Sequence, residues 1–385
     1  MQTLTWLGSL SAWPLLRNGS LSWNPSLGPA AESLTREIER ADPAAFAAAL
    51  QAEAQRRLAA FTDGVQRYRL SPPAERPPEP PAVWSRGSAR LLDYGAAGDP
   101  VVLCVPSLIN RAYILDLTAE HSLMHSLAAQ GLRPLLLDWG SPDADERGFT
   151  LTDYVDGHLA AALDAATGIG GGPVAVVGYC MGGTLAVALA AHRPDDVRAL
   201  ALLATPWAFG AGHAAVLPFL AAARPGLEAI IEAAGVLPVD VLQALFLSLN
   251  PGLAGAKFRR FAALPDGSPA VRDFVALEDW LNDGVPLAGP VARECLFDWY
   301  LANTPGRGQW RIGGDAVDPA AFSGPALIVV PEGDYIVPPE AAEPLATLLS
   351  GAELRRVAAG HIGMVAGSNA KALLHEPLGA WLTGG

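Results

Sequence analysis

The spacing of hydrophobic residues changes at about residue 89. Before it, one set of apolar side chains recurs every three or four positions, as on one face of a helix: Phe46, Leu50, Ala54, Leu58, Phe61 and Val65. The pair Asp42-Pro43 predicts the start of this helix, since Asp is a good N-cap and Pro suits the first helical position. We expect the apolar face to dock on the core or on a partner. The Pro-rich run 71–81 predicts a linker.

After residue 89, short apolar runs alternate with helical stretches. The predicted strands are residues 90–94, 101–105, 134–138, 174–177, 199–203, 326–330 and 353–358, and predicted helices include 152–166 and 183–192. Such alternation is typical of a parallel sheet covered by helices. The sequence therefore predicts an α/β fold.

One long segment, residues 206–323, breaks this alternation. It is helical and turn-rich, with many Trp and Phe residues, as expected for an insertion between two core strands. We therefore predict three parts: an accessory helical segment with its linker (1–88), a core (89–205 and 324–385) and a cap (206–323). We expect the cap to be mobile and to cover the functional site.

Composition narrows the class of protein. About half of the 385 residues are apolar (51%) and 17% are charged, so a large core can be buried. The net charge of −13 argues against nucleic acid as a partner. The three cysteines are widely spaced, without a CxxC pair or a metal-ligand cluster, which favours a reducing cytoplasm and no metal.

Membrane insertion is not expected. Residues 167–191 and 199–223 lack charged side chains and are long enough to cross a bilayer. Glycines interrupt the first stretch, and Pro206 and Pro218 interrupt the second, so neither should form one long helix. The N-terminal residues 1–16 lack the basic segment of a signal peptide.

A nucleophile elbow is the strongest chemical signal. Residues 174–184 read as a strand, a G-x-C-x-G turn and a helix of small residues. This is the form of the G-x-S-x-G elbow of α/β hydrolases, with Cys180 in place of serine. Gly178 and Gly182 leave room where the turn meets neighbouring backbone. The alternatives are a buried structural cysteine and a dinucleotide-binding turn, although the latter's G-x-G-x-x-G pattern is absent.

The other two members of a triad follow in the expected chain order of nucleophile, acid and base. Asp334 comes after the strand 326–330, and His361 comes after the last predicted strand. Asp334 would hold the imidazole of His361, which would act as the base. Glu332 and Asp315 are weaker candidates for the acid. His375 is expected on the surface.

Two backbone amides are expected to bind the oxyanion. The N–H of Met181 lies directly after the nucleophile, and the loop after strand 101–105 would supply the second, from Leu108 or a neighbour. A plain strand–helix connection is the alternative for this loop.

Several blocks together resemble polyhydroxyalkanoate synthases, particularly the short catalytic-subunit type. The similar blocks are P-S-L-I-N-R-A-Y-I-L-D-L (106–117), L-D-W-G-S-P-D (137–143), L-T-D-Y-V (151–155), G-Y-C-M-G-G-T-L (178–185), D-Y-I-V-P (334–338) and G-H-I (360–362). The resemblance covers roughly residues 90–381. Arg111 stands where the family usually has Lys, and Gly140 where it often has Arg.

The resemblance implies an acyltransferase. It implies that Cys180 is acylated by a 3-hydroxyacyl-CoA with release of coenzyme A, and that the acyl group passes to a growing polyester. Coenzyme A would enter as part of the substrate, and no other cofactor is expected. Expected partners are the polyester or granule surface and a second copy or second synthase subunit, in the cytoplasm or on granules. Two alternatives are a Cys-His-Asp hydrolase (a thioesterase, an esterase or a polyester depolymerase) and a non-catalytic granule-binding protein.

Overall fold

The computed structural model describes residues 12–21, 23, 27–214, 216–250 and 252–384. These residues form two compact units. One comprises the N-terminal residues up to Ala74 together with Asn250–Val275, and the other comprises Glu75–Leu249 and Ala276–Gly385. The expectation about a signal peptide falls mostly on residues outside the described ones.

The larger unit is built on an eight-stranded sheet of order β1-β2-β4-β3-β5-β6-β11-β12. Its strands are β1 (Ala82–Arg86), β2 (Ala89–Asp93), β3 (Val101–Val105), β4 (Arg133–Asp138), β5 (Val174–Tyr179), β6 (Val197–Leu203), β11 (Ala326–Pro331) and β12 (Glu353–Val357). All neighbours from β4 to β12 are parallel, whereas β1 and β2 add to the edge antiparallel. The predicted α/β fold is confirmed, and each predicted strand matches an observed one to within three residues.

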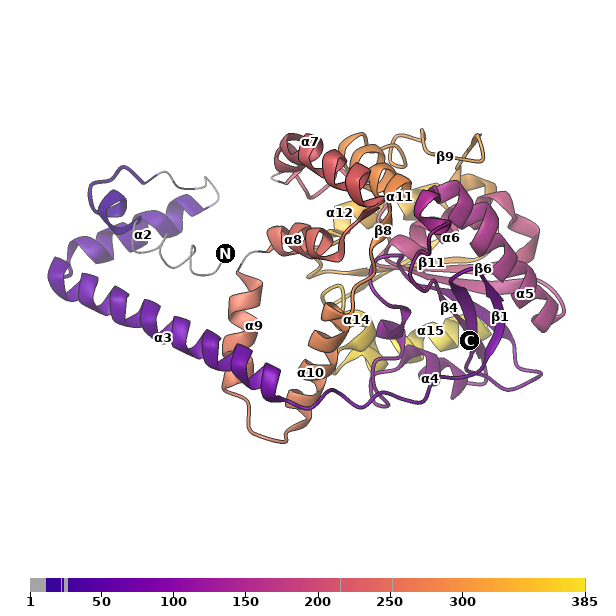
Figure 1. Ribbon diagram of the computed structural model, residues 1–385, viewed down its shortest axis with the longest axis horizontal. Coiled ribbons are helices and arrows are strands. Elements are labelled where there is room, and N and C mark those ends of the chain that lie inside the picture. Colours follow the sequence, from indigo (N-terminus) through magenta and orange to yellow (C-terminus); the bar gives the residue numbers. More distant parts are fainter. Residues whose placement is uncertain (1–11, 22, 24–26, 215, 251, 385) are drawn as a thin grey trace. The chain divides into compact units, whose positions relative to one another are not determined.

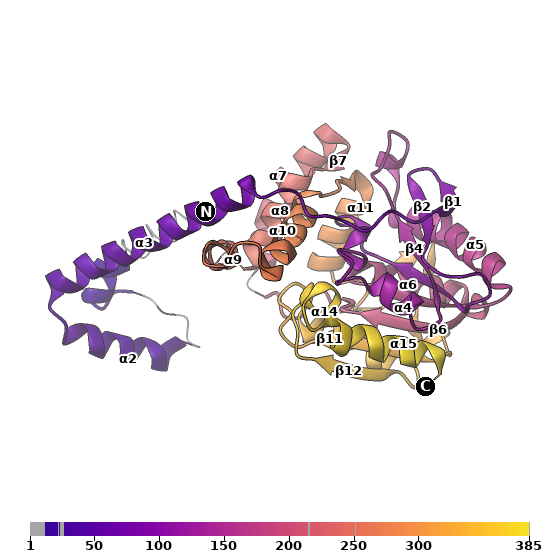
Figure 2. The same cartoon turned by 90° about the horizontal axis from the view of Figure 1, so that it is seen from below.

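Helices cover both faces of this sheet (Figure 1). The π-helical turn η4 (Asp153–Leu159), α5 (Ala160–Gly170) and α6 (Met181–His192) lie on one face, and α4 (Leu123–Ala128) and α15 (Glu376–Thr383) lie on the other. Figure 2, seen from below, shows the second pair on the near side of the strands. The strands β3, β5 and β11 are buried along their whole length, which explains their unbroken apolar sequence.

The insertion between β6 and β11 is mainly helical. It contains α7 (Leu217–Ala234), α8 (Val239–Leu249), α9 (Leu253–Ala262), α10 (Pro269–Asn282), α11 (Gly289–Arg293) and the π-helical turn η6 (Glu294–Leu301). The two-residue strands β7 (Val236–Leu237) and β8 (Leu287–Ala288) pair within it. Residues 250–275 belong to the smaller compact unit, so the segment predicted as one cap is divided between the two units.

The smaller unit contains α2 (Gly28–Glu39) and α3 (Pro43–Leu70). The side chain of Asp42 accepts a hydrogen bond from the Ala45 amide at 2.8 Å, so the predicted helix start is confirmed. The second half of α3 packs on α9. On the expected apolar face, Phe46, Leu50, Ala54, Phe61 and Val65 are half-buried, whereas Leu58 is 40% exposed.

Within the described part of the chain, no individual helix has the length and hydropathy needed to cross a membrane. The helices α8 and α9 meet the length and hydropathy criteria only when they are taken together as a bent pair.

Candidate active site

Cys180 occupies the sharp turn between β5 and α6. Its backbone has φ 54° and ψ −128°, a region that non-glycine residues rarely occupy. The Cys180 amide donates to the Leu203 carbonyl at 2.9 Å, and the Cys180 carbonyl accepts from the Gly183 amide at 2.9 Å. These two bonds hold the strained residue between neighbouring elements.

The glycines around Cys180 are required by close backbone contacts. A Cβ on Gly178 would overlap the backbone of Gly183, and one on Gly182 would overlap the carbonyls of Val105 and Pro106. A side chain at either position would therefore collide with neighbouring backbone, as the sequence indicated. Gly183 is also restricted, but by a side chain, since its Cβ would overlap that of Thr205.

His361 and Asp334 form a buried pair. His361 Nδ1 lies 2.6 Å from Asp334 Oδ2, and both residues are less than a tenth exposed. The other carboxylate oxygen of Asp334 accepts from the amides of Ile336 (2.8 Å) and Val337 (2.9 Å). Asp334 is thereby fixed in the loop after β11, where it orients the imidazole.

The Cys180 side chain also interacts with His361 and raises the pKa of its imidazole. Burial by itself would lower the pKa of His361, but the charge of the Cys180 sulfur and the bond to Asp334 raise it to about 10. The structure thus brings together the three residues that the sequence predicted, in the order Cys180, His361, Asp334.

The weaker candidates lie elsewhere. Glu332 and Asp315 are exposed, and neither is the carboxylate that bonds His361. The expectation that His375 lies on the surface is wrong. It is 2% exposed and its Nε2 lies 2.8 Å from the Val365 carbonyl oxygen, because η8 (Lys371–His375) turns it inward.

Two aromatic residues near the triad were not singled out by the sequence. The Tyr179 hydroxyl donates to the His361 carbonyl at 3.3 Å, and its ring lies 5.2 Å from the imidazole. Tyr300, on η6, interacts electrostatically with Cys180 and Asp334, and burial raises its pKa. Tyr179 is a variable position of the G-x-C-x-G pattern, and Tyr300 is one of many aromatics in the insertion, so neither carried a signal.

The two candidate oxyanion donors lie directly after Cys180 and in the loop after β3. Met181 is the first residue of α6, so its N–H has no carbonyl partner within that helix. Leu108 lies in the loop after β3 and is 6% exposed. The next amide, that of Ile109, donates to the Ser107 hydroxyl at 3.0 Å, which makes Ile109 a poorer candidate than Leu108.

Arg111 stands in the block 106–117, where the family usually has Lys. Its guanidinium lies 3.4 Å from the Asp283 carboxylate, so its charge is partly balanced. Arg76, whose guanidinium lies 3.6 Å from the centre of the Tyr113 ring, is another cation of the same unit.

Comparison with known proteins identifies the class and then the family. Residues 100–367 match the family model described as alpha/beta hydrolase fold. A hydrolase from Pseudomonas aeruginosa shares this fold, with a TM-score of 0.51, 18% identity and coverage of 77% of this chain and 94% of that one. The poly(3-hydroxyalkanoate) polymerase subunit PhaC of Allochromatium vinosum is 31% identical over 313 residues, which are 78% of this chain and 87% of that protein.

A second relative with the same name, from Haloferax mediterranei, is 31% identical over 78% of this chain. The chain spans 62% of the length of that relative. The protein therefore belongs to the poly(3-hydroxyalkanoate) polymerase family of α/β hydrolases, which confirms the resemblance seen in the sequence.

Proposed function

We propose that this protein polymerises 3-hydroxyacyl-CoA into a polyester through an acyl-thioenzyme on Cys180. The observation that carries the proposal is the buried His361–Asp334 pair, whose imidazole interacts electrostatically with the strained Cys180, in a chain of the polymerase family. The three thiols differ in a way that favours Cys180. Cys104 and Cys295 are buried, and burial raises the pKa of both well above its ordinary value, whereas Cys180 is partly exposed.

The first half-reaction transfers the acyl group to the enzyme. The Cys180 thiol gives its proton to His361, and the thiolate attacks the thioester carbonyl. The amides of Met181 and Leu108 stabilise the oxyanion. When the carbon–sulfur bond to coenzyme A breaks, the leaving thiolate takes the proton from His361, and a Cys180 thioester remains.

The second half-reaction extends the chain. His361 takes the proton of a 3-hydroxyl group, whose oxygen attacks the acyl carbonyl and forms an ester. The Cys180 sulfur leaves and recovers the proton through His361. Asp334 keeps Nδ1 of the imidazole occupied, so the other nitrogen faces the reacting groups. These steps use the thioester substrate and three side chains, and we propose no further cofactor.

The test is turnover of 3-hydroxybutyryl-CoA by the purified protein. Wild type should release coenzyme A and form insoluble polymer, and its intact mass should increase by the acyl group. Cys180→Ala should lose the adduct and at least about a thousandfold in rate. Cys104→Ala is the matched control and should retain both.

Other outcomes point elsewhere. Coenzyme A release with free 3-hydroxybutyrate would indicate a hydrolase, and no release would indicate a binding protein. We also propose that the enzyme acts in the cytoplasm at the granule surface, as a homodimer or with a second subunit. Co-sedimentation with polyester granules, and the mass of the assembly in solution, test these two points.

A further inference from the structure

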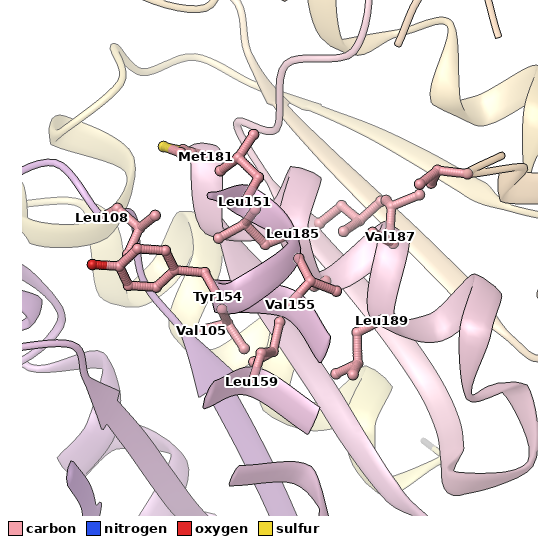
Figure 3. Close-up of a cluster of buried hydrophobic side chains, with 14 of the residues drawn as sticks. Val105, Leu108, Leu151, Tyr154, Val155, Leu159, Met181, Leu185, Val187 and Leu189 are labelled. Atoms are coloured by element: carbon pink, nitrogen blue, oxygen red, sulfur yellow. The ribbon is translucent and has the colours of Figure 1, made fainter. Parts of the chain in front are cut away.

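The two halves of the candidate site are supported differently. The elbow is held by apolar packing: Figure 3 shows Met181, the first residue of α6, in one buried cluster with Leu151. Asp334 instead lies on a loop, here called the acid loop (residues 332–337), whose backbone amides hold its carboxylate. Its position therefore depends on what holds that loop. A second buried histidine, His213, interacts with the acid loop and has no role in the proposed reaction so far.

His213 contacts both the insertion and the acid loop. It is 6% exposed, and its ring lies 5.7 Å from the ring of Tyr300 on η6, edge to face at 63°. Burial lowers the pKa of His213 below its ordinary value, although the backbone of Ile336 and the charge of Asp334 oppose this effect. The imidazole is therefore neutral at about pH 7 and has one N–H to donate.

The chain segment that carries His213 is anchored on the residues after the acid loop. The amide of Trp207 donates to the Ala341 carbonyl at 2.8 Å. Gly212 has φ 73°, and a Cβ on it would overlap the ring of Pro338. These contacts fix the backbone from which the imidazole extends, so His213 meets the acid loop from a rigid support.

Ile336 connects His213 to the carboxylate. The amides of Ile336 and Val337 donate to one oxygen of Asp334, at 2.8 and 2.9 Å. The other oxygen lies 2.6 Å from Nδ1 of His361. The amide of Ile336 is thus committed to Asp334, which leaves its carbonyl as the acceptor for an imidazole N–H. A shift of this part of the backbone would turn the carboxylate, and with it the imidazole of His361.

We propose that His213 is a positioning residue of this site: its N–H holds the Ile336 carbonyl and thereby keeps the carboxylate of Asp334 in place. The inference rests on the proposed function, because the rate that it affects is that of the reaction at Cys180. His213 acts through the acid loop and exchanges no proton with the substrate. Since His213 comes from the first residues of the insertion, the insertion as well as the core sets the geometry of the acid.

The kinetic test compares substitutions at position 213. His213→Phe keeps a buried ring and removes the N–H, so kcat for 3-hydroxybutyryl-CoA should fall about tenfold or more, while KM stays within about twofold. His213→Gln retains an N–H donor and should recover most of the lost rate. His213→Leu also lacks the donor, and it replaces His213→Phe if the phenyl ring prevents folding.

A proton NMR signal reports on the carboxylate directly. The Nδ1 proton of His361 lies in a short, charge-assisted bond to Asp334 and should resonate far downfield. The loss of this signal in Asp334→Asn assigns it. The signal should move upfield or broaden in His213→Phe and keep its wild-type position in His213→Gln. A role of His213 in packing alone would not separate the two variants in this way.

The matched control is Val197→Ala, which removes buried volume at the other end of the sheet. Val197 is 3% exposed and is the first residue of β6, whereas Cys180 follows the last residue of the parallel strand β5. Its kcat and its downfield signal should equal those of wild type.

Two results would overturn the inference. One is a wild-type kcat with an unmoved signal in His213→Phe, and the other is an equal loss in His213→Phe and His213→Gln. Absence of coenzyme A release from wild type would instead overturn the proposed function, and the NMR comparison would still decide whether His213 holds Asp334.

Discussion

At the scale of single residues, the site depends on how completely Asp334 is held. Each of its carboxylate oxygens has a partner. One oxygen accepts from the amides of Ile336 and Val337, and the other pairs with the imidazole of His361. The sequence could place Asp334 after a strand and His361 after the next. It could not show which carboxylate faces the imidazole, because that depends on the conformation of the loop at residues 332–337.

The raised pKa of His361 couples its protonation to folding. Its ordinary value is 6.5, and the folded protein raises the pKa to about 10. The stabilisation is therefore fully present below about pH 6.5 and is lost as the pH rises towards 10. We expect the free energy of unfolding of wild type to fall across this range. It should fall less in Asp334→Asn, because the amide lacks the charge that helps to hold the imidazolium.

Urea unfolding at about pH 6.5, 8 and 9.5, followed by tryptophan fluorescence, measures this difference. Other groups titrate in the same range, but they are common to both proteins. Glu332→Gln removes a nearby exposed carboxylate that does not bond His361, and it should follow wild type. Parallel pH curves for wild type and Asp334→Asn would show that this carboxylate does not raise the pKa of His361.

At the scale of elements, apolar runs were sufficient to locate the parallel strands, since buried strands have few polar positions. The edge strand β1 was not expected, because its residues are mostly exposed and it follows a Pro-rich run. The pattern of apolar residues also did not predict that η4 and η6 would be π-helical. The elbow was predictable because its glycines are imposed by backbone contacts rather than by side-chain packing.

Gly178 provides a test of the elbow. In Gly178→Ala the added methyl would overlap the backbone of Gly183, which cannot move without shifting α6. We expect a loss of at least about 1–3 kcal/mol in the free energy of unfolding. Turnover should also fall sharply, since α6 carries the Met181 amide. Denaturant unfolding and coenzyme A release measure the two effects.

Gly168→Ala is the control for that substitution. Gly168 lies in α5 with open space around its Cβ position, and its φ is not positive. The added methyl should stabilise the helix by up to about 1 kcal/mol and leave turnover unchanged. Similar losses in both variants would mean that the backbone contact at Gly178 does not decide the outcome.

At the scale of the whole molecule, the division into units follows contacts between residues far apart in the sequence. Gly64 of α3 lies so close to the Phe258 backbone that a Cβ would overlap its carbonyl, and Phe61 meets the Phe258 ring edge to face at 5.9 Å. The helical, aromatic-rich sequence of residues 206–323 predicted an insertion, but not that part of it packs on α3. The sequence of α3 or of the insertion, taken alone, does not show this contact. The mobile cap stays a prediction.

Arg67 gives the last prediction. Its guanidinium donates to the carbonyls of Phe261 (2.7 Å), Ala262 (3.3 Å) and Leu264 (2.7 Å), and it pairs with Asp266 at 2.7 Å. It thereby caps the C-terminal end of α9 and lies over the Phe261 ring. Hydrogen bonds to charged groups contribute about 1.5–3 kcal/mol each, so Arg67→Ala should open this end of α9.

Limited chymotrypsin digestion measures that opening. Cleavage between residues 250 and 275 should become about tenfold faster or more in Arg67→Ala, because proteolysis follows the population of the locally open form. The control is Arg69→Ala, which removes an exposed arginine from the same helical turn. Equal cleavage rates in the two variants would show that Arg67 does not hold α9. A faster rate in Arg67→Ala alone, with unchanged unfolding of the larger unit, would show that α3 stabilises part of the insertion locally.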